Sequence, residues 1–461
     1  MKRRNSKFAF VWVFFMAILL FWLRIYPDSN KYISSYYTIG FCMILYCFAN
    51  MLLLSSNGFY IFDPIPLVFL LYLFCIFIDP LINIKDGTVN NMGFDVMGGC
   101  DRATITFTIS YFFLILGYQV NIKKVGIPAI AFSGKSSDCC EQYTSYNDNY
   151  RIALFIWMIS FIFGCIELVA RGVSVSYFLS LGIYGTVEDI SGDSFLGFLG
   201  NFRFSMISAW LYLYVYRKKS PITIIAGLLT LEYFILRGFR HSLFVLIFSP
   251  IIFTYISNNK RVKFRTIISI LGIIVIVMGL MQFIRGALRS GNSIDWASFD
   301  SNIFIESIKG NFDVYKTFYG IVNAVPSQLD YQWGMASIVS VVTMLIPRAI
   351  WPQKPISPLI TELYRFCGPL AAQSGQAMPN ISEFYLDFGW FGCVIGFFIY
   401  GILLRKMRYL YTKEDRSIHD LVLYSTLLPA LMQVVLRGYS PSYWFLLLFY
   451  SFPILVIKRL G

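Results

Sequence analysis

Positively charged residues recur beside the ends of long apolar stretches in this sequence. They come from five separate parts of the chain: Arg203, Arg237 with Arg240, Arg285 with Arg289, Arg348 with Lys354, and Arg437. A guanidinium binds phosphate through two parallel hydrogen bonds and stays charged at any working pH. Snorkelling explains one such arginine, because the long side chain lifts its charge into the lipid headgroups. So many separate cations favour a converged pocket for a lipid-linked phosphate or pyrophosphate.

The stretch LIPRAIWPQKP, residues 345–355, carries two of these cations and contains three prolines, so it cannot form the interior of a helix. Its prolines fix φ and remove backbone donors, so the stretch predicts a stiff turn. Such a turn presents Arg348 and Lys354 together at a low entropic cost. We therefore expect both cations to face the same anionic group.

Acidic residues are sparse near these cations. Glu383 and Asp387 lie in SEFYLDFGWFG, just ahead of an apolar stretch. A base that accepts the proton of a sugar hydroxyl would come from such a carboxylate or from His241. The alternative is that both carboxylates only stabilise the start of the next helix. The residues alone leave both interpretations open.

Membrane spans are the elements that must position these side chains. Of the 461 residues, 57% are hydrophobic and 14% are charged, against about 25% charged in soluble domains. Apolar stretches of spanning length recur throughout, which predicts an all-α polytopic membrane protein. The net charge of +13 would suggest nucleic acid in a soluble protein. Here it fits basic loops on the inner side of the membrane, and no nucleic-acid partner is expected.

The pattern predicts about twelve transmembrane helices. They are 8–25, 36–55, 66–84, 103–122, 152–170, 195–216, 221–236, 242–257, 266–284, 387–404, 421–436 and 443–457. The first is expected to stay uncleaved, because its apolar core is long and no small-residue cleavage site follows. The phase of Lys and Arg in the loops places both termini inside.

These spans divide the chain into three parts. Residues 1–285 hold spans one to nine, residues 286–386 form a large outer loop, and residues 387–461 hold the last three spans. Within the loop, residues 302–325 show one apolar face at helical spacing. Residues 334–346 are apolar but too short to span, which predicts a re-entrant or interfacial helix.

The sequence offers little for metal binding. Its two histidines, His241 and His419, are far apart, and no pair of its nine cysteines forms a CxxC motif. A zinc or haem site is therefore not expected, and we predict neither a metal nor a cofactor.

Three local patterns resemble the Wzy-type O-antigen (oligosaccharide repeat-unit) polymerases. The first is Gly238-Phe239-Arg240 at the start of a span. The second is the IPRxxWPxKP pattern at 346–355, which is followed downstream by SEFYLDFGWFG. The third is Arg437-Gly438 at the outer end of the penultimate span. The order and spacing of these patterns agree along nearly the whole chain.

The resemblance implies a GT-C-like glycosyltransferase in the bacterial inner membrane, with both termini cytoplasmic and a periplasmic active site. It would transfer a growing glycan from polyprenyl pyrophosphate to the non-reducing end of a new lipid-linked unit. Neither a metal nor a nucleotide sugar would be needed, and a chain-length regulator protein is a candidate partner. The implied catalytic residues are Arg240, Arg348, Arg437 and Glu383; the implied substrate-binding residues are Arg203, Arg237, Arg285, Arg289, Trp351, Lys354 and Asp387.

Two other activities stay open at this point. An O-antigen ligase would use a similar arginine-rich outer site. A polysaccharide flippase or other transporter can also have twelve spans, but it would be expected to show a repeat between its halves and polar groups at mid-membrane. The long outer loop and the cations at the outer edge favour the polymerase.

Overall fold

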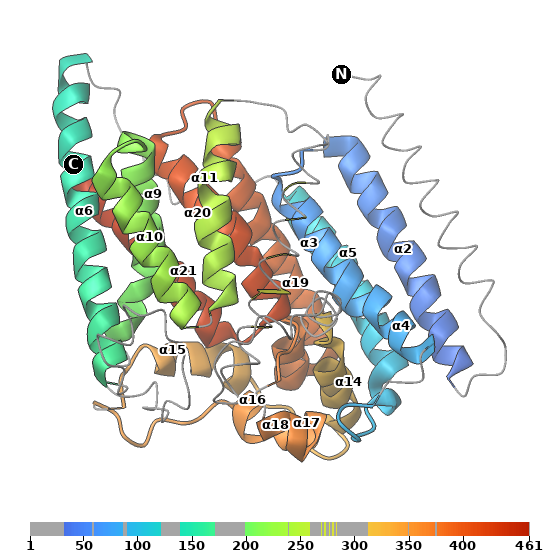
Figure 1. The fold of residues 1–461 in the computed structure, drawn as a ribbon. Coiled ribbons are helices and arrows are strands. Elements are labelled where there is room, and N and C mark those ends of the chain that lie inside the picture. The colour runs from blue at the N-terminus through green and yellow to red at the C-terminus, as the bar shows by residue number, and fades with distance from the viewer. Residues whose placement is uncertain are drawn as a thin grey trace.

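The computed structural model describes residues 32–57, 60–85, 90–120, 139–170, 199–237, 239–258, 312–348, 350–373 and 376–460, with isolated positions between 269 and 283. Every named element among these residues is a helix, as the all-α prediction required. The long helices run roughly alongside one another as a bundle (Figure 1).

One half of the bundle is built from the early helices. Helix α2 is Ile33–Asn57, and α5 is Cys100–Gln119. Between them, α3 (Pro64–Tyr72), η2 (Leu73–Ile78) and α4 (Asp79–Lys85) follow one another without a break. Pro64 stands in the first turn of α3, where its missing N–H costs nothing. These helices share a hydrophobic core with α19, which is Ile381–Thr412.

The other half packs around a second hydrophobic core. It is formed by α6 (Cys139–Ala170), η4 (Asn201–Phe204), α9 (Ser205–Arg217), α10 (Pro221–Leu236), α11 (Arg240–Ser257), α20 (Ile418–Leu436) and α21 (Ser440–Leu460). Helix α20 contributes to both cores, with Tyr424 in one and Val422 in the other. It therefore joins the two halves.

Six helices in the described residues are long and apolar enough to cross a membrane. They cover Ile33–Leu54, Pro64–Lys85, Asn147–Val169, Ile381–Thr412, Ile418–Leu436 and Ser440–Leu460. The predicted spans at 103–122, 195–216, 221–236 and 242–257 also fall on helices, which are shorter or less apolar. The predicted span 8–25 lies outside the described residues, and 266–284 nearly so. The total of twelve thus stays a prediction.

Short helices cover one end of the bundle (Figure 1). They are α14 (Tyr315–Ala324), η6 (Met335–Val339), α15 (Ser340–Met344), α16 (Pro358–Thr361), α17 (Leu363–Cys367) and α18 (Pro369–Gln373). We call residues 312–348 and 350–373 the cap, and this end of the bundle the cap end. Helix α14 is buried along nearly its whole length. The apolar stretch 334–346 folds as η6 and α15, and leaves Ile338 and Val342 exposed.

Candidate functional site

The predicted cations that the structure describes lie at the cap end of the bundle. Arg203 lies on η4, and Arg237 and Arg437 stand at the C-terminal ends of α10 and α20. Arg348 and Lys354 follow α15 in the cap. Arg240 begins α11, but its side chain is outside the described part of the structure, as are Arg285 and Arg289.

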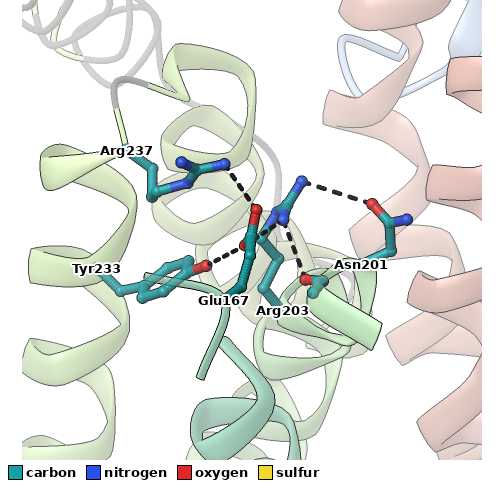
Figure 2. Close-up of polar contacts among 6 residues, drawn as sticks. Glu167, Asn201, Arg203, Tyr233 and Arg237 are labelled. Carbon is teal, nitrogen blue, oxygen red and sulfur yellow. Dashed lines mark hydrogen bonds and ion pairs between the residues drawn. The ribbon is translucent and has the colours of Figure 1, made fainter. Parts of the chain in front are cut away.

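Two of these arginines are held by a carboxylate that the sequence interpretation missed. Glu167, on α6, accepts a hydrogen bond of 2.5 Å from Arg203 Nη1 and one of 3.0 Å from Arg237 Nη2. The Tyr233 hydroxyl adds a third at 3.2 Å, as Figure 2 shows. The carboxylate is 2% exposed, so these are buried ion pairs. A lone acidic residue in an apolar span was the available signal, because such groups are costly unless paired.

The same two guanidiniums also enclose an aromatic ring. Arg203 Cζ lies 4.9 Å from the centre of the Phe239 ring, and Arg237 Cζ lies 5.1 Å from it. Cation–π attraction of this kind strengthens when the groups are desolvated. Phe239 directly precedes Arg240, so the Glu167 cluster fixes the backbone from which α11 starts. Direct substrate binding by Arg203 and Arg237 stays a prediction.

The proline-rich stretch forms the predicted turn, and its cations hydrogen-bond to its own backbone. Arg348 Nη1 donates to the carbonyls of Pro352, at 3.1 Å, and Lys354, at 3.2 Å. Lys354 Nζ donates to the carbonyl of Ile346 at 3.2 Å and is nearly buried. Trp351 stays 40% exposed. The two cations thus shape the turn, whatever else they bind.

Glu383 and Asp387 each bind the N-terminus of another helix. Glu383 accepts a 2.5 Å hydrogen bond from the Ser440 amide, at the start of α21, and a second from the Ser440 hydroxyl. Asp387 accepts bonds of 2.9 and 2.8 Å from the amides of Ala336 and Ser337, at the start of η6. Free N–H groups at a helix start favour a negative charge. Both carboxylates thus contact the starts of helices other than α19, while Glu383 also lies in the first turn of α19; a role of Glu383 as a base stays a prediction.

Helix α19 breaks just after these carboxylates. Phe388 and Gly389 leave the helical conformation, and Gly389 has φ of 62° and ψ of −148°, which only glycine adopts easily. The break lies within the DFG of SEFYLDFGWFG. It lets the first turns of α19 face the cap while the rest of the helix runs through the bundle.

A groove of about 1420 Å³ follows α19 along its length. Helix α20 lines it with Leu427 and Leu431, and α21 lines it with Trp444 and Leu448. Its walls are mostly apolar, and several lining side chains are open to the surface. A straight helix of the 32 residues of α19 would be about 48 Å long, whereas the hydrocarbon core of a bilayer is roughly 30 Å thick. The helix is therefore long enough to cross a membrane.

Polar groups gather where the groove reaches the cap end. Asn380, Ser440 and Tyr443 line it there. Arg437 stands three residues before Ser440, is exposed, and has no side-chain hydrogen-bond partner among the described residues. A Cβ on Gly438 would overlap the backbone of Asn380, so glycine allows this close approach. The Arg-Gly pair therefore brings a cation beside the polar end of an apolar groove.

His241, on the first turn of α11, packs against the rings of Phe204 and Phe239, which also contact Arg203. Its Nε2 is buried and has no hydrogen-bond partner in the described residues. A role of His241 as a base stays a prediction.

No group of three or more His, Cys, Asp or Glu side chains that could hold a metal ion occurs among the described residues. The metal independence implied by the sequence patterns stays a prediction. The charged groups described at the cap end include the guanidiniums, the Lys354 ammonium, and the carboxylates that pair with helix starts or arginines. Such a set suits an anionic substrate.

Comparison with known proteins agrees with these features. A family model for the O-antigen polysaccharide polymerase Wzy matches residues 8–459. Two curated relatives, each named O-antigen polymerase, come from Salmonella typhimurium and Salmonella typhi and are 24% identical over 232 residues. That alignment covers 49% of this chain and 53% of each relative, so the chain matches about half of their length. No solved structure matches. The chain belongs to the O-antigen polysaccharide polymerase Wzy family.

Proposed function

We propose that this protein polymerises oligosaccharide repeat units carried on polyprenyl pyrophosphate. The observation that carries the proposal is the apolar groove along α19, whose polar end is lined by Ser440, three residues after Arg437. A polyprenyl chain needs an apolar path through the membrane, and its pyrophosphate needs a cation at the surface. Membership of the family and the names of both relatives support the same activity.

In this proposal the donor's polyprenyl tail lies in the groove and its pyrophosphate lies against Arg437. A hydroxyl at the non-reducing end of a new unit attacks the anomeric carbon of the growing glycan. The new C–O bond forms while the bond to the pyrophosphate breaks, and the pyrophosphate keeps the electron pair. A guanidinium placed at this leaving group stabilises the transition state more than the ground state.

We retain Arg240 and Arg348 as proposed contacts of the same pyrophosphate, since both come from the cap end. The hydroxyl proton must pass to a base as the new bond forms. Glu383 can serve as that base only after it releases Ser440, because both of its oxygens accept hydrogen bonds from that residue. Proximity between two membrane-bound substrates supplies much of the remaining rate enhancement.

We further propose that the cap faces the periplasm of the bacterial inner membrane and that both termini are cytoplasmic. The basic residues at the opposite end of the bundle support this orientation, among them Arg217 and Lys218 at the end of α9 and Arg459 at the end of α21. A GT-C-like arrangement, independence from nucleotide sugars and a chain-length regulator as partner belong to the same proposal.

The test is an assay with purified protein, a synthetic lipid-linked repeat unit and no nucleotide sugar. The wild-type protein should produce a ladder of polymers. Arg437→Lys keeps a positive charge but loses the bidentate fork, and should cost about 3 kcal/mol, or roughly a hundredfold in rate. Arg365→Lys is the matched control, because Arg365 lies in the cap and pairs with Glu362. Equal ladders from both variants would refute the role of Arg437.

A genetic experiment separates the polymerase from the two alternatives. Deletion of a polymerase leaves single repeat units on the surface lipid, deletion of a ligase leaves none, and deletion of a flippase traps the units inside the cell. We expect single units.

A further inference from the structure

Trp333 is held in a backbone conformation that tryptophan rarely adopts. Its φ is 49°, in the left-handed region, and its side chain is 74% exposed. A bulky residue there is a steric outlier, and such strain persists only where the surrounding structure enforces it. Glycine or asparagine would fit the backbone better, so the fold alone does not explain the indole.

The turn that carries Trp333 is fixed to the break in α19. The amides of Gln332 and Trp333 donate to the carbonyls of Leu386 and Asp387, at 3.0 and 3.1 Å. The Asp387 carboxylate in turn binds the start of η6, on the far side of the same turn. The indole therefore stands on a backbone held at both sides, and its position is set before any ligand arrives.

Trp333 lies in an aromatic group at the cap end of the groove. Its ring centre is 6.3 Å from that of Tyr331 and 6.1 Å from that of Phe388, both in edge-on geometry. All three residues line the groove, as do the polar residues Asn380 and Ser440. A group linked to a lipid in this groove would emerge beside these rings.

We propose that Trp333 is a stacking platform for a sugar ring of the lipid-linked repeat unit. This rests on the proposed function, since it assumes that a glycan is attached to the occupant of the groove. A pyranose presents a face of C–H groups, which packs on an aromatic face. The exposed indole of Trp333 supplies that face at the cap end of the groove.

A second turn in the chain provides a matched control. Met92 also has φ of 49°, is 60% exposed and is followed by a glycine with positive φ, as Trp333 is followed by Gly334. Both turns are closed by a backbone hydrogen bond across four residues. Asparagine before glycine is the preferred sequence for such turns. Met92→Asn and Trp333→Asn should therefore relieve the same backbone strain, and only the second removes a ring from the groove.

The experiment measures binding of two probes to the purified full-length protein. One is the lipid-free oligosaccharide released by mild acid from the host's own lipid-linked units, and the other is polyprenyl pyrophosphate. We expect Trp333→Asn to weaken oligosaccharide binding about tenfold, and to leave polyprenyl pyrophosphate binding and the melting temperature unchanged or improved. Met92→Asn should bind both probes normally, and Trp333→Phe should recover part of the loss.

Two results would overturn the proposal. Wild-type oligosaccharide binding by Trp333→Asn would show that the ring makes no sugar contact. An equal loss of both probes would show that Trp333 only anchors the protein at the membrane surface, as interfacial aromatics commonly do. The binding assay needs no turnover, so a failure of polymerisation itself remains distinguishable: oligosaccharide binding that depends on Trp333 would still support the platform.

Discussion

Replacing Glu167 by glutamine should destabilise the protein strongly. The carboxylate is the shared partner of Arg203 and Arg237, whose side chains are only 9% and 11% exposed. Glutamine removes the negative charge and turns one acceptor oxygen into a donor that faces a guanidinium. Removing one partner of a buried ion pair costs about 3–5 kcal/mol, because the other charge stays buried without compensation.

For a chain of 461 residues, about 3 kcal/mol corresponds to a fall of roughly 3 °C in melting temperature. The buried cysteines, such as Cys47 and Cys75, allow a direct assay. A thiol-reactive dye added during heating reports their exposure as the bundle opens. The measurement is made on purified wild type and Glu167→Gln in the same detergent.

Glu362→Gln is the control, because it removes the same charge from a more exposed pair. Glu362 lies 2.9 Å from Arg365, and their side chains are 25% and 39% exposed. Surface pairs contribute about 0–1 kcal/mol, so this variant should melt within about 1 °C of wild type. A Glu167→Gln protein that melts like Glu362→Gln would refute the assignment of Glu167 as the charge that holds both arginines.

Two further predictions concern packing and metal. Gly438→Ala should lower the yield of folded protein severalfold, since its Cβ overlaps the Asn380 backbone; normal yield in size-exclusion chromatography would contradict the close approach. Polymerisation should continue at a similar rate in EDTA. A loss of activity in EDTA that Mg²⁺ restores would refute metal independence.

The sequence predicted the helices far better than it predicted the contacts between them. A long apolar stretch favours a helix whatever surrounds it, so most spans in the described residues fall on helices. The cap-end position of Arg203, Arg237 and Arg437 followed from the same spans. The break at Phe388 and Gly389 was not predicted, because the span was expected to start at residue 387 and the residues before it were assigned to the outer loop.

The partners of the charged groups could not be read from the sequence. Glu167 is 36 and 70 residues from the two arginines it binds. Glu383 reaches an amide 57 residues away, and Asp387 reaches back 50 and 51. Such pairings depend on which helix faces pack together. The spacing of the residues along the chain does not indicate this packing. An acidic residue near a cluster of arginines could equally have been a base or a structural counter-ion.

The groove along α19 has a consequence for handling the protein. Lining residues such as Phe391, Ile395 and Leu448 are exposed, so we expect the lipid tail proposed to occupy the groove to exchange sideways with the surrounding membrane. Detergent alkyl chains enter by the same route, and each buried methylene contributes about 0.8 kcal/mol. We therefore expect the apparent Michaelis constant for a lipid-linked unit to rise with detergent chain length. Lipid nanodiscs, which offer the groove only bilayer lipids, should remove that dependence.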